Sequence, residues 1–568
     1  MPIPFFRNPS PRGAGAPLAI VLAPLGRLRF YDGWRIFTIL VALLVLVPLS
    51  VVGFSWLTPA GDIWSHLREN LLARLLLNSL WLVVGVGGGT LLLGVSLAWL
   101  TAVCEFPGRS FFSWALLLPL AMPTYVLAFV FLGLFDYAGP IQSAFREWFG
   151  VGTPFPNMRS GAGVVLVMSL ALYPYVYLLT KNAFQSQGKR ALEAAETLGC
   201  GLLEGFFRVA LPMARPWIGG GLLLVLMEVM ADFGAVSIFN FDTFTTAIYK
   251  AWYGFFSLPA AAQLSSLLVA LVLLLVAMER KLISPRRRFT TSRQYGSGER
   301  LRLRGWKGVA ATAWASAVLL AGFLIPVFQL GTWALASFSQ EFNSRYLGLV
   351  GRSLLLGISA ALLITATALV ISYASRRHPD GLTRTLVQVA NLGYALPGAV
   401  LAVGIFIPLA ALDNLIIDVA RQLWGVRLGP LLQGTVIIML AAYLVRFLAT
   451  GFKPIDSAMH RVTPSIDEAA RLTGLRGPGI LVRIHLPMLR GGLMTAATIA
   501  LIDVMKEMPI TLMTRPFGWD TLAVKIFELT SEGEWERAAL PAVGLVLAGL
   551  APIVLLMRHS EKSEKSRK

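Results

Sequence analysis

The sequence predicts an all-α, polytopic membrane protein with about 12 transmembrane helices arranged as two parallel six-helix repeats. Three observations predict this class. Of the 568 residues, 56% are hydrophobic and 14% are charged, which is far too apolar for a soluble globular chain. Apolar runs long enough to cross a hydrocarbon layer of roughly 30 Å recur along the whole chain. A polar, alanine-containing segment occurs twice between such runs, at 193–212 and 468–487.

The candidate spans follow one another in two sets of six. Prolines inside several of them do not exclude a span, because neighbouring helices can satisfy the backbone groups that a proline frees. The first set is 36–57, 78–102, 111–136, 161–180, 216–240 and 260–278, and the second set is 308–333, 350–374, 387–411, 430–450, 490–513 and 540–557.

Basic residues concentrate in three segments outside these spans. The N-terminal arm 1–35 carries five arginines against one acid, the linker 279–307 carries ten basic residues, and the tail 558–568 is also basic. Because short cytoplasmic segments of membrane proteins are enriched in Lys and Arg, we expect both termini and the linker to be cytoplasmic.

The net charge of +19 comes largely from these segments. It favours attraction to anionic membrane lipid over nucleic acid, because the basic residues lack interleaved aromatic residues and a soluble domain to present them. Cys104 and Cys200 fall near the cytoplasmic face, where a disulfide is not expected. The five histidines show no metal-ligand spacing, and no catalytic constellation recurs, so we expect no metal site and no catalytic residue.

The two polar segments belong to a longer internal repeat. Glu468 follows Glu193 by 275 positions, and several residue pairs downstream keep that offset, whereas upstream pairs such as Pro123 and Pro397 keep an offset of 274. Two homologous halves of six spans each enter the membrane in the same direction, so an axis along the membrane normal should relate them. The predicted organisation is an arm 1–35, a first half 36–278, a linker 279–307, a second half 308–557 and a tail 558–568.

Each polar segment has the pattern Glu-Ala-Ala, three residues, Gly, nine residues, an aliphatic residue, one residue and Leu-Pro. Val209 fills the aliphatic position in the first copy and Ile484 fills it in the second. The Glu-Ala-Ala start favours a helix, the glycine interrupts it, and the proline closes the segment just before the next span. We therefore predict a short helix, a turn and a second helix outside the bilayer, within loops 182–215 and 451–489.

This pattern resembles the cytoplasmic loop signature of the membrane subunits of bacterial ABC importers. A single copy could be an alanine-rich amphipathic connector, but two complete copies in register favour the signature. The resemblance implies that each loop carries a coupling helix that docks into a groove on an ATPase subunit. The residues to which it assigns this coupling are Glu193, Ala194, Ala195, Gly199, Leu211, Pro212, Glu468, Ala469, Ala470, Gly474, Leu486 and Pro487.

The resemblance also implies a location, the inner membrane of a bacterium, and partners. We find no phosphate-binding loop in the sequence, so ATP should be used by a separate ATP-binding subunit, in two copies, and this chain should be no enzyme and should bind no cofactor. A periplasmic solute-binding protein should deliver the solute. An ion-gradient-driven secondary transporter of two parallel halves is the alternative of a different class, although it does not explain two matched loops.

Two further segments narrow the solute. The fused two-half arrangement, with the segments 119–140 and 231–254, resembles the permeases of ferric iron importers, which implies iron(III) as the solute. Permeases for thiamine and for aminoethylphosphonate are similar, so these two solutes stay open.

Four acids inside the predicted spans are candidates for the translocation path. They form two pairs, Glu228 with Asp232 and Asp503 with Glu507, and each pair is four residues apart and thus on one helical face. An Asp near a helix centre costs about 2.5 to 3.5 kcal/mol in a membrane, so such groups normally face protein or a water-filled cavity. The alternatives are structural: Lys506 could neutralise Glu507 or Asp503, and Asp232 could bond to backbone near Gly234.

Overall fold

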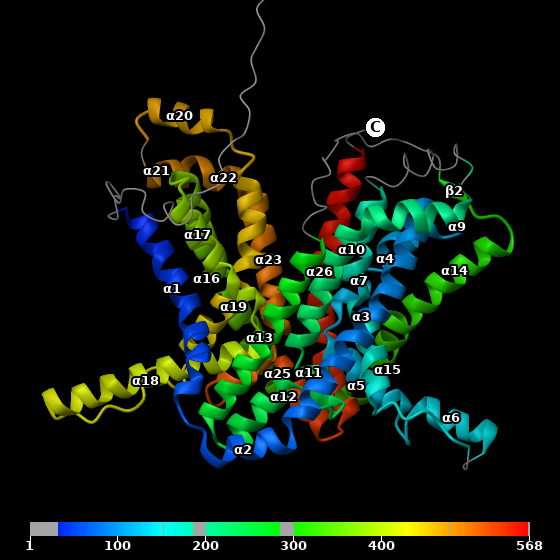
Figure 1. The fold of residues 1–568 in the computed structure, drawn as a ribbon, viewed down its shortest axis with the longest axis horizontal. Coiled ribbons are helices and arrows are strands. Elements are labelled where there is room, and N and C mark those ends of the chain that lie inside the picture. Colours follow the sequence, from blue (N-terminus) through cyan, green and yellow to red (C-terminus); the bar gives the residue numbers. More distant parts are fainter. Residues whose placement is uncertain are drawn as a thin grey trace, which may run out of the picture.

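The computed structural model describes residues 32–150, 153–185, 199, 201–283, 300–475 and 477–565, and these residues are overwhelmingly helical (Figure 1). The elements of the first half are α1 (Gly33–Gly53), η1 (Ser55–Leu57), α2 (Gly61–Asn70), α3 (Leu72–Val103), β1 (Cys104–Glu105), α4 (Arg109–Ala115), η2 (Leu118–Ala121), α5 (Thr124–Phe135), α6 (Pro140–Phe149), α7 (Gly161–Ala183), α9 (Leu202–Gly205), η4 (Phe206–Ala210), α10 (Leu211–Ala231), α11 (Gly234–Ile238), α12 (Phe244–Tyr249), η5 (Lys250–Gly254) and α13 (Leu258–Ile283).

The second half repeats this order of elements with different loop lengths. Its elements are β2 (Leu301–Arg302), α14 (Trp306–Leu319), η7 (Leu320–Leu324), α15 (Ile325–Glu341), α16 (Ser344–Arg377), α17 (Gly381–Ala390), η8 (Leu392–Ala395), α18 (Gly398–Trp424), α19 (Val436–Met459), α20 (Pro464–Leu472), α21 (Pro478–Ile480), η9 (Leu481–His485), α22 (Leu486–Met488), α23 (Arg490–Lys506), α24 (Pro509–Thr514), α25 (Leu522–Ser531) and α26 (Trp535–Lys565).

The all-α polytopic class is confirmed. Within the described residues, ten helices are long and apolar enough to cross a membrane, and the count is 11 if a pair bent by 79°, Pro478–Met488 with Arg490–Lys506, is one span. The twelfth predicted span, 540–557, lies within α26.

Two predicted spans, 111–136 and 387–411, are not continuous helices. Each breaks before a proline, Pro123 or Pro397, and a short 3₁₀ turn, η2 or η8, precedes the break. Met122 and Leu396, the residues before those prolines, have extended backbone angles with ψ of 121° and 131°. The cause is local, because a proline disfavours the helical conformation of the residue that it follows. The long helices α5 and α18 begin only after these breaks.

The first span of each half packs against the opposite half. Helix α1 lies against α16, α17 and α18 of the second half. In the first half, α3 and α4 contact α14, and α5 contacts α15. Figure 1 shows this exchange, with the blue α1 beside the yellow-green α16 and α17, and the green α14 beside the blue α4. The two sequence repeats are therefore interlocked and do not pack as separate units.

Aromatic packing joins the halves near α5. The ring of Phe129 lies 6.5 Å from the rings of both Trp333 and Trp535, in stacked orientations. A Cβ atom added at Gly133 would approach the Trp333 ring to 2.6 Å, so this glycine permits the close approach of α5 and α15. The apolar core that results contains buried side chains from both halves.

The end of the basic linker is attached to the first half. Strands β1 and β2 pair in parallel, with Cys104 opposite Leu301 and Glu105 opposite Arg302. Glu105 also forms ion pairs with Arg300, at 3.4 Å, and with Arg109, at 3.1 Å. The part of the linker between residues 284 and 299 lies outside the described residues.

Candidate translocation cavity and coupling loops

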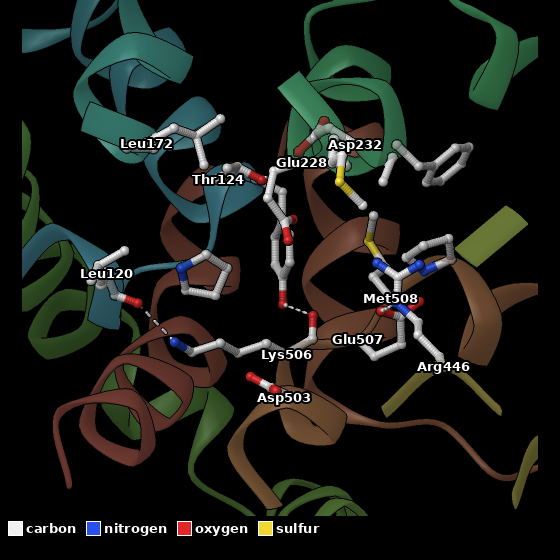
Figure 2. Close-up of a pocket in the computed structure, with 18 of the residues that line it drawn as sticks. Leu120, Thr124, Leu172, Glu228, Asp232, Arg446, Asp503, Lys506, Glu507 and Met508 are labelled. Carbon is white, nitrogen blue, oxygen red and sulfur yellow. Dashed lines mark hydrogen bonds and ion pairs between the residues drawn. The ribbon is translucent and has the colours of Figure 1, made fainter. Parts of the chain in front are cut away.

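A cavity of about 320 Å³ lies where the two halves meet. Its wall is formed by η2, the start of α5, α7 and the α10–α11 break from the first half, and by η8, α19 and the α23–α24 break from the second half. Figure 2 shows Glu228 and Asp232 on one side and Asp503 and Glu507 on the other. The structure thus brings all four acids that the sequence singled out around one space.

Asp232 interrupts its span and caps the helix that follows. Helix α10 ends at Ala231, and Asp232 has an extended backbone with ψ of 130°. Its Oδ1 accepts hydrogen bonds from the backbone N–H groups of Ala235 and Val236, at 2.9 and 3.3 Å, while the Thr124 hydroxyl donates to Oδ2 at 2.5 Å. Such capping satisfies amide groups that a helix start leaves unpaired. The alternative of backbone bonding near Gly234 is therefore what the structure shows for this acid.

Glu507, at the matched position of the second half, also interrupts its span and caps the helix that follows. Helix α23 ends at Lys506, Glu507 is extended with ψ of 118°, and its Oε1 accepts a hydrogen bond from the Ile510 N–H at 3.1 Å. Its Oε2 lies 3.2 Å from Nε of Arg446, and Glu507 is buried whereas the Arg446 side chain is 13% exposed. Arg446 also donates to the carbonyl oxygen of Leu396 at 2.9 Å.

Arg446 is thus the partner of Glu507, and this pairing was not predicted from the sequence. A visible signal existed, because Arg446 is an arginine inside the predicted span 430–450. Among the described residues Lys506 forms no ion pair with Glu507 or Asp503. Its Nζ donates instead to the carbonyl oxygen of Leu120 in the other half, at 2.9 Å (Figure 2).

Glu228 and Asp503 stand one turn before these two capping acids. Both are half-buried and line the cavity. Within the part of the chain that the structure describes, Glu228 forms no hydrogen bond and no ion pair, and Asp503 forms no ion pair. The Asp503 side chain does have a hydrogen bond to Thr450. Unlike Asp232 and Glu507, however, neither of these two acids accepts a backbone hydrogen bond as a helix cap among the described residues, so both present carboxylate oxygens to the cavity.

The charge of the cavity is not symmetric. The acids are duplicated, but the residues that match Arg446 and Lys506 in the first half are Ala171 and Ala231. Four carboxylates and two cations give the lining a formal charge of −2. Among the described residues no three His, Cys, Asp or Glu side chains are placed to share one metal ion. The cavity can therefore attract a cation without a preformed set of protein ligands.

The second coupling loop has the predicted helix and turn. Helix α20 starts with Pro464 in its first turn, exposes Glu468 and Ala469, and buries Ala470. Gly474 follows with φ of +84°, a left-handed conformation that favours glycine at a helix end. Further along, Leu486 and Pro487 are exposed at the start of α22.

The first coupling loop is described only in part. Glu193, Ala194 and Ala195 lie outside the described residues. Gly199 has φ of +81°, close to the value at its counterpart Gly474. Leu211 and Pro212 open helix α10, which leads directly to the cavity.

Helix α20 is held by a partly buried charge network around Asp467. Oδ2 of Asp467 accepts a hydrogen bond from Nε of Arg376 at 2.8 Å, and Oδ1 lies 2.6 Å from Nε2 of the fully buried His485. Burial raises the pKa of Asp467, but the hydrogen bonds and charges of Arg376 and His485 outweigh this, so its pKa lies below the ordinary value.

Sequence comparison of the halves could not reveal this network. The matched positions of Asp467 and His485 in the first copy are Leu192 and Ala210, so the repeat gave no signal. A histidine and an aspartate 18 residues apart are unremarkable in a sequence until η9 folds back over α20.

Interlocked repeats of helical spans, broken at matched acids around a shared cavity, define a helical membrane transport protein. Residues 90–289 match the family described as binding-protein-dependent transport system inner membrane component. The chain is 30% identical over 187 residues to the molybdenum transport system permease protein ModB of Escherichia coli, which covers 32% of this chain and 80% of that protein. The chain therefore belongs to the family of binding-protein-dependent transport system inner membrane components.

Two further relatives match along nearly the full length. The Fe(3+)-transport system permease protein FbpB 2 of Haemophilus influenzae is 26% identical over 504 residues, covering 86% of this chain and 91% of the relative. The probable ABC transporter permease protein y4fN of Sinorhizobium fredii is 23% identical over 556 residues, covering 92% of this chain and 94% of the relative. Both alignments are long enough to include the two halves and the linker.

Proposed function

We propose that this chain is the permease of an ATP-driven importer of iron(III), which receives the ion from a periplasmic binding protein. The observation that carries the proposal is the cavity between the halves, where matched acids from both repeats meet. Carboxylate oxygen is a preferred ligand type for hard cations. The near full-length similarity to an Fe(3+)-transport permease supports the same solute.

The four acids divide into two roles in this proposal. Asp232 and Glu507 keep the spans broken at the level of the cavity, and their charges contribute to the local field. Glu228 and Asp503 offer oxygen atoms that a passing cation can contact. Two carboxylates from opposite halves would hold a trivalent ion weakly, which suits passage better than storage.

Coupling to ATP hydrolysis would pass through α20 and its counterpart in the first half. Exposed Glu468, exposed Ala469 and Leu472, which is 90% exposed, give α20 an outward surface that another subunit can cover. Helix α20 and the C-terminal end lie on the same side of the molecule in Figure 1, which supports a cytoplasmic position for both. We infer two ATP-binding subunits, one for each coupling loop, and ATP hydrolysis by those subunits.

An oxyanion is the second candidate solute. Arg446 and Lys506 line the cavity, and relatives that match about a third of this chain are molybdenum and sulfate transport system permeases. However, Arg446 is already paired with Glu507, and the formal charge of −2 opposes an anion. Iron(III) is therefore the better-supported solute.

Uptake into vesicles tests the proposal. The permease is reconstituted with its ATP-binding subunit, and uptake of radiolabelled iron(III) from the loaded binding protein is compared with uptake of molybdate, sulfate, thiamine and aminoethylphosphonate. ATP-dependent uptake of iron alone is expected. Uptake of one of the other solutes without iron uptake would reject iron(III) as the solute. Uptake driven by an ion gradient without ATP would reject the class of ATP-driven importers.

A further inference from the structure

A second cavity, of about 650 Å³, lies beside coupling helix α20, away from the central cavity. It is bounded by the C-terminal end of α16, by α20 and by the α21–η9 segment. Its polar lining is strongly basic: Arg376, Arg377, His378, Arg471 and His485 face a single acid, Asp467. With neutral histidines this lining has a formal charge of +2.

Ion pairs within the protein neutralise only part of this positive charge. Arg376 is bound to Asp467 at 2.8 Å, and Arg377 and His378 contact Asp32, at 2.9 and 2.8 Å. Including Asp32 still leaves a formal charge of +1. Arg471, in the last turn of α20, is exposed and forms no ion pair among the described residues.

His485 supplies an unused hydrogen-bonding atom in the same wall. The side chain is fully buried, its Nε2 contacts Asp467, and its ring packs edge-on against Tyr373 with centroids 5.5 Å apart. Its Nδ1 has no hydrogen-bond partner among the residues that the structure describes. A buried polar atom without a hydrogen-bond partner is unfavourable, so this position favours a ligand that offers it a hydrogen bond.

We propose that this cavity binds a phosphate-bearing anion, with Arg471 and Arg377 as its charged contacts and Nδ1 of His485 as the acceptor for a hydroxyl group of the ligand. Guanidinium groups bind phosphate through paired, charge-assisted hydrogen bonds, and Nδ1 of a neutral imidazole whose Nε2–H is donated to a carboxylate accepts a hydrogen bond from a ligand hydroxyl. The anion is either the headgroup of an anionic lipid or free phosphate. Basic pockets between membrane helices at the cytoplasmic face are suited to lipid headgroups of this kind.

The site belongs to the second half alone. At the positions that match Asp467, His485 and Arg471, the first copy has Leu192, Ala210 and Glu196. An acid in place of Arg471 would repel an anion. Because Arg471 belongs to α20 and Arg377 to α16, a bound anion links the coupling helix to the membrane-spanning helix, and only the second coupling loop would respond to it.

The test uses the full chain with its ATP-binding subunits, purified in detergent. One arm measures cardiolipin binding by native mass spectrometry, with phosphatidylcholine as the neutral lipid. The other arm measures inorganic phosphate by equilibrium dialysis. The variants are Arg471→Gln and Arg471→Glu, and the matched control is Arg483→Gln, because Arg483 is an exposed arginine of η9 that does not line the cavity.

Arg471→Gln should weaken anion binding about fivefold, the equivalent of about 1 kcal/mol for one basic residue near an anionic headgroup, and Arg471→Glu should weaken it further. Arg483→Gln should leave binding unchanged. A loss confined to the cardiolipin arm identifies a lipid headgroup, and a loss confined to the phosphate arm identifies a soluble anion. Equal binding by all variants, or an equal loss in Arg483→Gln, would overturn the site.

Discussion

Asp232 and Glu507 occupy matched positions in the two halves, and each carboxylate caps the short helix that resumes after a break in its span. They differ in their charged partner, since Glu507 pairs with Arg446 at 3.2 Å whereas Asp232 accepts a hydrogen bond from the neutral hydroxyl of Thr124. One repeat has thus gained a buried ion pair at a position where the other has a neutral contact. Both acids therefore have structural partners, and they differ in how much the loss of their charge should destabilise the fold.

Neutralising Glu507 should destabilise the protein more than neutralising Asp232. Glu507→Gln removes the carboxylate paired with the partly buried Arg446 guanidinium, and the loss of one partner costs about 3 to 5 kcal/mol in fully buried pairs. Asp232→Asn keeps a capping oxygen and should cost about 1 kcal/mol or less. The thermal unfolding midpoints of the two purified variants measure this difference. Equal midpoints would show that the ion pair contributes little.

Neutralising Glu228 and Asp503 should reduce transport and leave folding intact. Neither acid forms an ion pair among the described residues, so Glu228→Gln with Asp503→Asn removes charge from the cavity and breaks no such contact. The double variant loses two charged contacts to a cation, and since about 1.4 kcal/mol for either one is tenfold, iron uptake should fall at least tenfold. Uptake in vesicles, divided by the amount of folded protein, is the measurement. Normal uptake by the double variant would remove these acids from the path.

A bulky residue at Gly474 should weaken docking of the ATP-binding subunit. Gly474 has φ of +84°, which costs an L-residue such as valine about 1 to 2 kcal/mol, so Gly474→Val should displace the end of α20. Gly491→Ala is the matched control, because Gly491 is helical and has open space around it. Co-purification of the ATP-binding subunit reports the result. Equal recovery with both variants would contradict a docking role for this turn.

Reversing the charge of both coupling acids should also disrupt docking. Glu468 is exposed on α20, so Glu468→Lys changes the surface offered to the partner without touching the core. Glu193→Lys makes the same charge change at the matched sequence position of the first loop. We expect loss of both subunit co-purification and transport. The exposed acid Glu532, replaced by Lys, serves as a control away from the coupling loops. Unchanged binding in the double variant would assign Glu468 to helix stabilisation alone, worth about 0.3 to 1 kcal/mol.

The anchoring of α20 should depend on pH in the acidic range. The pKa of Asp467 is lowered in the folded protein, because the hydrogen bonds from Arg376 and His485 outweigh the effect of burial. Its stabilising contribution is therefore fully present above the unfolded pKa of about 3.9 and is lost as the pH falls through the lower folded pKa. Asp467→Asn should be less stable at pH 7 and should lose less stability on acidification. Thermal unfolding midpoints of both proteins are measured between pH 7 and pH 3. If the midpoints of variant and parent change in parallel with pH, the network does not contribute as described.

The apolar runs, the basic segments and the 275-residue repeat together determined the membrane class, the two-half plan and the positions of the four acids, because each is a pattern read along one chain. Local rules also determined the left-handed turn at Gly474, since that conformation depends on the residue itself. Only the tertiary structure decided which half α1 packs against, that Arg446 and not Lys506 pairs with Glu507, and that His485 closes over Asp467. Those contacts join residues far apart in the sequence, and several have no counterpart in the other repeat. They depend on how helices pack, which neither hydropathy nor residue spacing records.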